Sequence, residues 1–263
     1  MPLICLSSPK GGVGKSTLTA NLAFAMQRLG HPVALIDFDV QNALRLHLGL
    51  GLAEVRGFVA PSLQNPEWHR LLLATPSGIR ILPYGAVTET QQLAFENHLQ
   101  NDPSFLREGL RELLDTPGLL IIADTPPGPS PALTALNRLA DLRIAVLLAD
   151  AASASLLPSI ESGRFYKPTA AGEPPKIHYI LNQVDQRRRL NRDVTEFIQA
   201  RLGSALLGLV HRDEALPEAL ACQQSVFAFD PSAASAYDID AIARRLAHWV
   251  DGHARPAKSA YCY

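Results

Sequence analysis

The sequence predicts a three-layer α/β/α fold, in which helices cover both faces of a mostly parallel central sheet. Three observations lead to this prediction. Short runs of Val, Ile and Leu recur without polar alternation, helix-like stretches separate them, and a glycine-rich loop joins the first run to the first helix. Continuous apolar strands are typical of a sheet that is buried on both faces, and parallel neighbours need helical crossovers between them.

The expected strands and helices alternate along the chain. The apolar runs that predict strands span 3–7, 32–38, 79–83, 119–124, 142–149, 177–181 and 205–210. The stretches that predict helices span 16–29, 105–114, 132–139, 153–163, 192–202 and 239–250. Gly30 follows the first helix, where a left-handed cap would end it.

A chain of 263 residues is long enough for one large domain with a substantial core. We expect this domain to span residues 1–252, with 253–263 as a loose C-terminal tail. Residues 51–101 are the least regular segment, and we treat them as an elaboration of the same domain. They contain Trp68, which we expect to be buried in the core. The segment 169–175 predicts a surface loop.

The composition is that of an ordinary globular protein. Hydrophobic residues make up 47% and charged residues 19%, with a formal net charge of −1, so no global basic field favours nucleic acid or anionic lipid. Cys5, Cys222 and Cys262 are too scattered for a disulfide framework or a zinc site, and we expect reduced thiols in a cytoplasmic protein. No stretch approaches the ~20 apolar residues of a transmembrane helix, so any membrane association is expected to be peripheral.

The loop SPKGGVGKST at residues 8–17 predicts a phosphate site. Its end matches the pattern G-x-x-x-x-G-K-[ST], while Pro9 occupies the first glycine position. Backbone N–H groups at a helix N-terminus bind phosphate, Lys15 can neutralise β- and γ-phosphate oxygens, and the Ser16 hydroxyl can bind Mg²⁺. The expected nucleotide-binding residues are Gly11, Gly12, Val13, Gly14, Lys15, Ser16 and Thr17.

Residues 10–16 resemble the deviant Walker A motif K-G-G-x-G-K-[ST] of ParA/MinD-type ATPases at every position. The resemblance implies a P-loop NTPase fold, slow Mg²⁺-dependent hydrolysis of ATP to ADP, and an ATP-dependent homodimer. It also implies a catalytic role for Lys10, which would cross the dimer interface to phosphates bound by the other subunit. A triphosphate buried between two subunits needs more positive charge than Lys15 and Mg²⁺ supply, which agrees with this role. The alternative for Lys10 is a solvated surface lysine.

Acidic residues end two further expected strands, where ligands bind in open α/β sheets. Asp37 and Asp39 resemble the family's switch I segment, so Asp39 is expected to orient the attacking water and to contribute to the metal shell. A plain turn is the alternative for this pair. Asp124 resembles the Walker B aspartate and is expected to hold Mg²⁺ with Ser16, while Gly128 would offer its N–H to the γ-phosphate.

Two further residues are expected to contact the base of the nucleotide. Asn182 follows an expected strand, and an asparagine amide can pair with N6 and N7 of adenine, although a turn asparagine is the alternative. Arg212 lies in the loop that flanks the base in the family, next to His211, where the family often has proline. A structural role is the alternative for both of these side chains.

Within the family, the chain most resembles the BcsQ (YhjQ) group, which is encoded with bacterial cellulose synthase. The stretches that carry this resemblance are 39–46, 82–85, 211–221 and 224–226, together with Trp68 and the leucines after it. It implies a regulatory, assembly or localisation factor for cellulose synthesis and secretion. The implied partners are cellulose synthase subunits and accessory proteins, which would recruit the protein to the inner membrane or a cell pole.

A DNA-partitioning ATPase is the alternative from a different class. Four arginines lie within 187–192 and would contact phosphate, although Asp185 and Asp193 flank them. A metabolic enzyme that transfers phosphate to a small acceptor is a third possibility, which the second lysine of the loop argues against.

Overall fold

The computed structural model describes residues 2–65, 67–166 and 176–253. Within them, an eight-stranded sheet forms the middle layer, in the order β3-β4-β2-β5-β1-β6-β7-β8. The strands are β1 (Leu3–Ser7), β2 (Val33–Asp37), β3 (Leu73–Ala74), β4 (Arg80–Leu82), β5 (Leu120–Asp124), β6 (Leu142–Leu148), β7 (Ile177–Val184) and β8 (Leu206–His211). Every neighbouring pair is parallel except β3 and β4, which are antiparallel. The loop expected at 169–175 and the tail expected beyond residue 253 lie outside the described residues.

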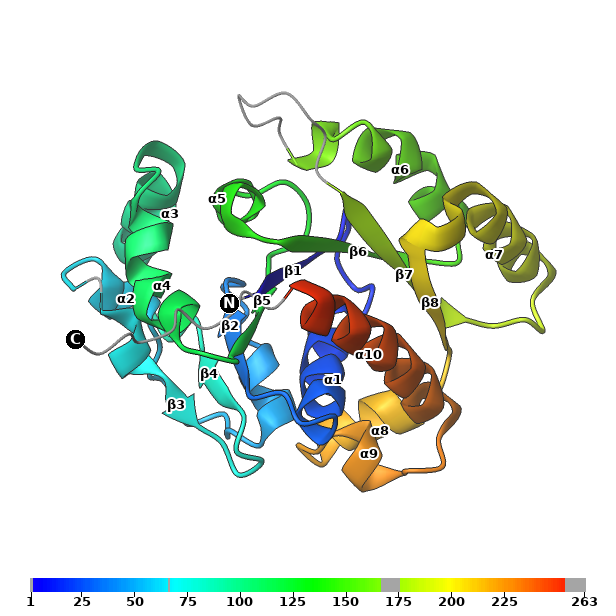
Figure 1. Ribbon diagram of the computed structural model, residues 1–263, viewed down its shortest axis with the longest axis horizontal. Helices are drawn as coiled ribbons and strands as arrows, with labels where there is room; N and C mark the ends of the chain where they lie inside the picture. Colours follow the sequence, from blue (N-terminus) through cyan, green and yellow to red (C-terminus); the bar gives the residue numbers. More distant parts are fainter. Residues whose placement is uncertain (1, 66, 167–175, 254–263) are drawn as a thin grey trace, which may run out of the picture.

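Helices cover both faces of the sheet, as Figure 1 shows. One face carries α1 (Lys15–Arg28), α8 (Ala215–Ala221), α9 (Val226–Phe229), α10 (Ala234–His253) and the 3-10 helix η1 (Leu44–Leu48). The other face carries α2 (Val59–Ser62), α3 (Glu89–Asn101), α4 (Phe105–Asp115), α5 (Pro131–Leu139), α6 (Ala151–Glu161) and α7 (Arg189–Leu202). Three short 3-10 turns complete the elements: η2 (Trp68–Leu71), η3 (Arg164–Tyr166) and η4 (Gly203–Ala205). The predicted three-layer architecture is confirmed.

The side chains of the central strands point alternately into two separate hydrophobic cores. Leu3 and Cys5 of β1 point into one hydrophobic cluster, and Ile4 and Leu6 point into the other. Because side chains alternate between the faces of a strand, an uninterrupted apolar run serves both clusters at once. This explains why the central strands show no polar alternation in the sequence.

Most expected elements appear close to their expected bounds. The helix expected at 16–29 is α1, and Gly30 after it adopts φ 93°, which confirms the left-handed cap. The sequence did not indicate β3, α8 or α9, which are too short to show a period. The last helix extends to His253, one residue into the expected tail.

The irregular segment 51–101 packs onto the sheet through aromatic side chains. Trp68 is fully buried, as expected, and its ring centroid lies 4.8 Å from that of Phe58. Phe58 in turn meets Phe38 edge-on at 5.5 Å, and Phe95 contacts both rings. Phe38 directly follows β2, so this cluster joins the segment to the loop that carries Asp37 and Asp39.

The parallel topology gathers the expected functional loops at one edge of the sheet. The strands β2, β5, β1, β6, β7 and β8 are neighbours and run in the same direction, so the loops that follow them meet there. In the described part of the chain, none of the helices is long and apolar enough to cross a membrane.

Candidate functional site

The loop after β1 has the backbone conformation of a phosphate cradle. Gly12 and Gly14 adopt φ 73° and 83°, in the left-handed region that favours glycine. Gly14 is also the N-cap of α1 and contributes no side-chain cap, so the first N–H groups of the helix stay available to an anion. A Cβ atom on Gly14 would lie 2.4 Å from Nδ2 of Asn182, so space as well as φ requires glycine here.

Lys15 and Ser16 both bind the carboxylate of Asp124. The Lys15 Nζ lies 2.6 Å from Asp124 Oδ1, and the Ser16 hydroxyl donates to Oδ2 at 2.6 Å. Asp124 is fully buried and Lys15 is 6% exposed, so each charge depends on the other for compensation. A phosphate ligand would supply a second partner for Lys15 and release a carboxylate oxygen.

The residues present fit a magnesium ion, because a hydroxyl and a carboxylate are the hard oxygen ligands that it prefers. Ser16 and Asp124 would hold it. Across the described ranges, no group of three or more His, Cys, Asp or Glu side chains could hold a metal ion, so phosphate oxygens and water would complete the coordination.

Asp37 and Asp39 organise the loop after β2. Asp37 accepts hydrogen bonds from the backbone N–H groups of Asp39 at 2.9 Å and Leu44 at 3.1 Å. Burial, and after it the nearby Asp124 carboxylate, raise the pKa of Asp37 to about 8. Asp39 is half-buried, and its Oδ1 accepts from the backbone N–H of Gln41 at 3.0 Å. Both aspartates therefore make turn contacts, and the water-orienting and metal roles of Asp39 stay predictions.

Lys10 lies outside this cradle and pairs with its own chain. Its Nζ is 2.5 Å from Oδ2 of Asp150, the residue that caps α6 through Oδ1 and the Ser153 N–H at 2.7 Å. Burial alone would raise the pKa of Asp150, but the hydrogen bonds from Lys10 and Ser153 hold it below its usual value. The side chains of Lys10 and Asp150 are 29% and 39% exposed, so a partner molecule can reach the pair.

A cavity of about 300 Å³ opens next to Gly14 and Thr17 and has room for a base. It is lined further by Asn182, Gln183, His211, Arg212, Asp213, Glu214, Leu216, Pro217 and Leu220. The structure thus brings Asn182 and Arg212 together beside the phosphate loop, from β7 and from the loop after β8.

Two contacts at this site were not indicated by the sequence. One N–H of the Asn182 Nδ2 donates to the Val13 carbonyl at 2.7 Å, so Oδ1 and the second N–H are left for a base, and the expected pairing with adenine stays a prediction. The Gly128 N–H donates to the Ser8 carbonyl at 2.8 Å, so it is not free for the γ-phosphate. Asn182 of β7 and Gly128 of the loop after β5 therefore hold the phosphate loop in place, through contacts that local sequence does not indicate.

A buried histidine lies behind the loop. His47 of η1 is 2% exposed, and its Nε2 lies 3.5 Å from the Thr17 hydroxyl. Desolvation lowers its pKa to about 4, although the Asp124 carboxylate acts in the opposite direction. His47 is therefore neutral at physiological pH, and it links the segment after the Asp37 loop to the helix that begins at the cradle.

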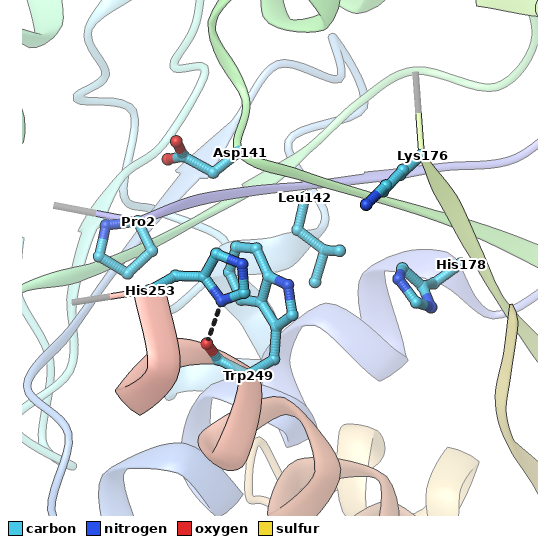
Figure 2. A pocket seen from close by; sticks show the side chains of 7 residues that line it. All are labelled: Pro2, Asp141, Leu142, Lys176, His178, Trp249 and His253. Atoms are coloured by element: carbon cyan, nitrogen blue, oxygen red, sulfur yellow. Dashed lines mark hydrogen bonds between the residues drawn. The ribbon is translucent and has the colours of Figure 1, made fainter. Parts of the chain in front are cut away.

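A second cavity, of about 550 Å³, lies at the opposite edge of the sheet (Figure 2). Trp249 and His253 stack there with ring centroids 4.4 Å apart, facing His178, Lys176 and Asp141. The predicted nucleotide and metal residues contribute nothing to it. The chemistry indicated by the phosphate loop is therefore confined to the carboxyl edge.

Sequence reasoning missed Asp150, His47 and Asp238. Asp150 lies 140 positions from Lys10, and Asp238 on α10 bonds His211 across 27 positions. The one available signal was for Asp150, because an aspartate after an apolar strand and three residues before Ser153 is a typical N-cap.

The chain is similar to known proteins over most of its length. The family model described as "Cellulose biosynthesis protein BcsQ" matches residues 1–249. The protein of that name from Escherichia coli K12 is 27% identical over 252 residues, which cover 95% of this chain and 94% of that protein. The chromosome-partitioning ATPase Soj from Thermus thermophilus is 31% identical over 263 residues, with 94% of each chain covered.

The fold has solved relatives as well. The septum site-determining protein MinD from Pyrococcus horikoshii, complexed with Mg-ADP, superposes with a TM-score of 0.72 at 20% identity, covering 93% of this chain and 95% of that one. At this identity the likeness concerns the fold alone.

Proposed function

The chain belongs to the BcsQ family and is an ATPase of the ParA/MinD type, and from this premise we propose that it is a slow, Mg²⁺-dependent switch that dimerises around ATP. The observation that carries the proposal is the placement of two lysines at one edge of the sheet. Lys15 lies within the cradle beside Asp124, whereas Lys10 lies outside it and pairs with Asp150. A phosphate cradle that needed only Lys15 would not require Lys10 as well.

The chain's own residues would divide the work as follows. The N–H groups at the start of α1 and the Lys15 ammonium bind the phosphates, and Ser16 and Asp124 hold Mg²⁺, which would neutralise charge on the phosphate oxygens. Asp39 would orient the attacking water. Lys10 would leave Asp150 and contact the phosphates of the other subunit, so that nucleotide joins the two protomers.

Light scattering on size-exclusion peaks tests the switch directly. Wild-type protein is expected to be dimeric with Mg-ATP or a non-hydrolysable analogue, and monomeric with Mg-ADP. Lys10→Ala should bind ATP normally, by calorimetry, yet stay monomeric. Lys176→Ala is the matched control, because this lysine is exposed and lies at the opposite edge. An unimpaired Lys10→Ala dimer would exclude the role across the interface.

We propose further that the ATP dimer regulates, assembles or positions the machinery of cellulose synthesis and secretion. The support is the BcsQ family match and the E. coli relative of that name. The protein would be cytoplasmic, and its partners would bring it to the inner membrane or a cell pole. Tagged protein should copurify cellulose synthase subunits with Mg-ATP and not with Mg-ADP. Recovery of DNA or a DNA-binding partner instead would contradict this client.

DNA partitioning remains the second candidate, because the Soj relative is a chromosome-partitioning ATPase. Arg187, Arg188 and Arg189 are exposed near the same edge, yet Asp185 pairs with the first two and Asp193 with the third. Partitioning predicts ATP-dependent retention of arbitrary duplex that weakens steeply with salt. Replacing the three arginines by alanine would then abolish retention.

A further inference from the structure

The base cavity contains a buried acceptor that the chain itself does not satisfy. Asn182 is 3% exposed, and one N–H of its Nδ2 donates to the Val13 carbonyl at 2.7 Å. Only an N–H can face a carbonyl, so this contact fixes the orientation of the amide. Within the described residues, Oδ1 of Asn182 has no hydrogen-bond partner. An unpaired buried acceptor is unfavourable, so a ligand that brings a donor to it gains affinity.

His211 provides a second group in the same cavity. Its backbone N–H and its ring Nδ1 both lie 2.9 Å from Oδ2 of Asp238 on α10. Because a carboxylate accepts hydrogen bonds, Nδ1 carries the proton in this pair, and in the neutral ring Nε2 is then an acceptor. The side chain of His211 is 41% exposed and lines the cavity, whereas that of Asp238 is 20% exposed and is not among the lining residues.

We propose that His211 determines the base specificity of this site, accepting a hydrogen bond at Nε2 from the exocyclic amino group at position 6 of adenine, with Asp238 as its positioning residue. The proposal rests on ATP being the nucleotide of the proposed function. Adenine presents a donor at this position and guanine an acceptor. Two acceptors, from Asn182 and His211, therefore select the 6-amino purine, and a guanine carbonyl would leave both unpaired.

Calorimetry with three probes separates the contact between His211 and the 6-amino group of adenine from nucleotide binding in general. The probes are Mg-ATP, Mg-GTP and the Mg²⁺ complex of purine riboside triphosphate, which has the same ring without the 6-amino group. Wild-type protein should bind ATP about tenfold or more tightly than the purine analogue, and GTP more weakly still. His211→Leu should lose about three- to tenfold in ATP affinity and little in affinity for the analogue, so that the two affinities converge.

Two changes at Asp238 test the orienting role. Asp238→Ala should reduce discrimination between ATP and the purine analogue in the same direction as His211→Leu. Asp238→Asn keeps an oxygen that accepts from Nδ1 and should restore discrimination. His248→Leu is the matched control, since His248 is an exposed histidine on the same helix as Asp238. Thermal unfolding by circular dichroism shows whether each variant is folded. If His211→Leu fails to fold, Asp238→Ala carries the test, because Asp238 does not line the cavity.

The outcomes distinguish the two proposals. If wild-type protein binds none of the three triphosphates, the proposed function fails. If it binds ATP and the purine analogue equally, or if His211→Leu weakens both by the same factor, the specificity role of His211 is overturned while the ATPase remains. Convergence of the two affinities in His211→Leu and Asp238→Ala, with discrimination retained in Asp238→Asn and His248→Leu, supports it.

Discussion

The Lys10 ammonium lies 2.5 Å from the Asp150 carboxylate, so the lysine proposed to act on a second protomer is held by its own chain in the monomer. The loop after β1 carries Lys10 and the end of β6 leads into Asp150, and these two strands are paired. Dimerisation therefore exchanges one partner of Lys10 for another. The strength of the pair with Asp150 counts against the dimer.

Asp150→Asn should accordingly tighten the ATP dimer. Partly exposed ion pairs contribute about 0.2–1 kcal/mol each, and a symmetric dimer breaks two of them, so its dissociation constant should fall about 2- to 30-fold. Asparagine can still cap α6 through its oxygen. Analytical ultracentrifugation with Mg-ATP measures the constant, and Asp193→Asn, at an exposed pair on α7, is the control. A weaker dimer would show instead that Asp150 orients Lys10 for its partner.

Asp39→Ala should slow ATP hydrolysis and leave the dimer assembled. If Asp39 orients the attacking water, its loss is expected to reduce the rate about 100-fold or more. Asp39→Asn keeps an acceptor for the Gln41 N–H and so retains the turn. Phosphate release and light scattering on the same sample separate the two effects. Unchanged phosphate release in both variants would exclude the water-orienting role and favour the plain turn.

Gly14→Ala should strongly weaken nucleotide binding. A methyl group would lie 2.4 Å from Asn182 Nδ2 and would occupy a backbone with φ 83°. The left-handed conformation alone costs a non-glycine residue about 1 kcal/mol, and the displaced amide would disturb both the cradle and the base cavity. Calorimetry should show ATP affinity reduced at least about tenfold. Gly51→Ala, where a Cβ meets open space, should bind like wild type.

His47 should make the protein less stable as the pH falls from 7 to 5. Its pKa is about 4 when folded against the ordinary 6.5, so the unfolded chain binds the proton first and stability is lost with decreasing pH. Between pH 7 and 5 the loss attributable to His47 is about 2 kcal/mol. Urea unfolding of His47→Gln should show a smaller decline across this window than wild type. His248→Gln, at an exposed histidine, should decline as wild type does.

Local patterns were sufficient to predict the layers and the cradle. The apolar runs of β1, β2 and β5 and the glycine-rich loop each lie within a few residues, so strand, loop and helix follow from short segments. The two-residue strand β3 has no such pattern, because its antiparallel pairing with β4 depends on the fold around it. The aromatic cluster around Trp68 draws on residues from 38 to 105 and is likewise set by packing.

The candidate site, like the fold, has one part that the sequence predicts and another that it does not. The sequence predicted which loops meet, because parallel strands that end in Asp37 and Asp124 share an edge. It could not predict that Asn182 donates a hydrogen bond to Val13, or that Asp150 holds Lys10. These contacts join residues 140 or more positions apart, and they form only after the sheet order is fixed.

The aromatic cluster also gives the protein an internal fluorophore. Trp68 is buried from solvent, and the ring of Phe58 lies between it and Phe38. Phe38 is flanked in the sequence by Asp37 and Asp39, the two aspartates of the loop after β2. A rearrangement of that loop would shift Phe38 against Phe58 and thereby change the surroundings of the indole. In a Trp249→Phe background, the emission of Trp68 would then report the nucleotide state without any attached label.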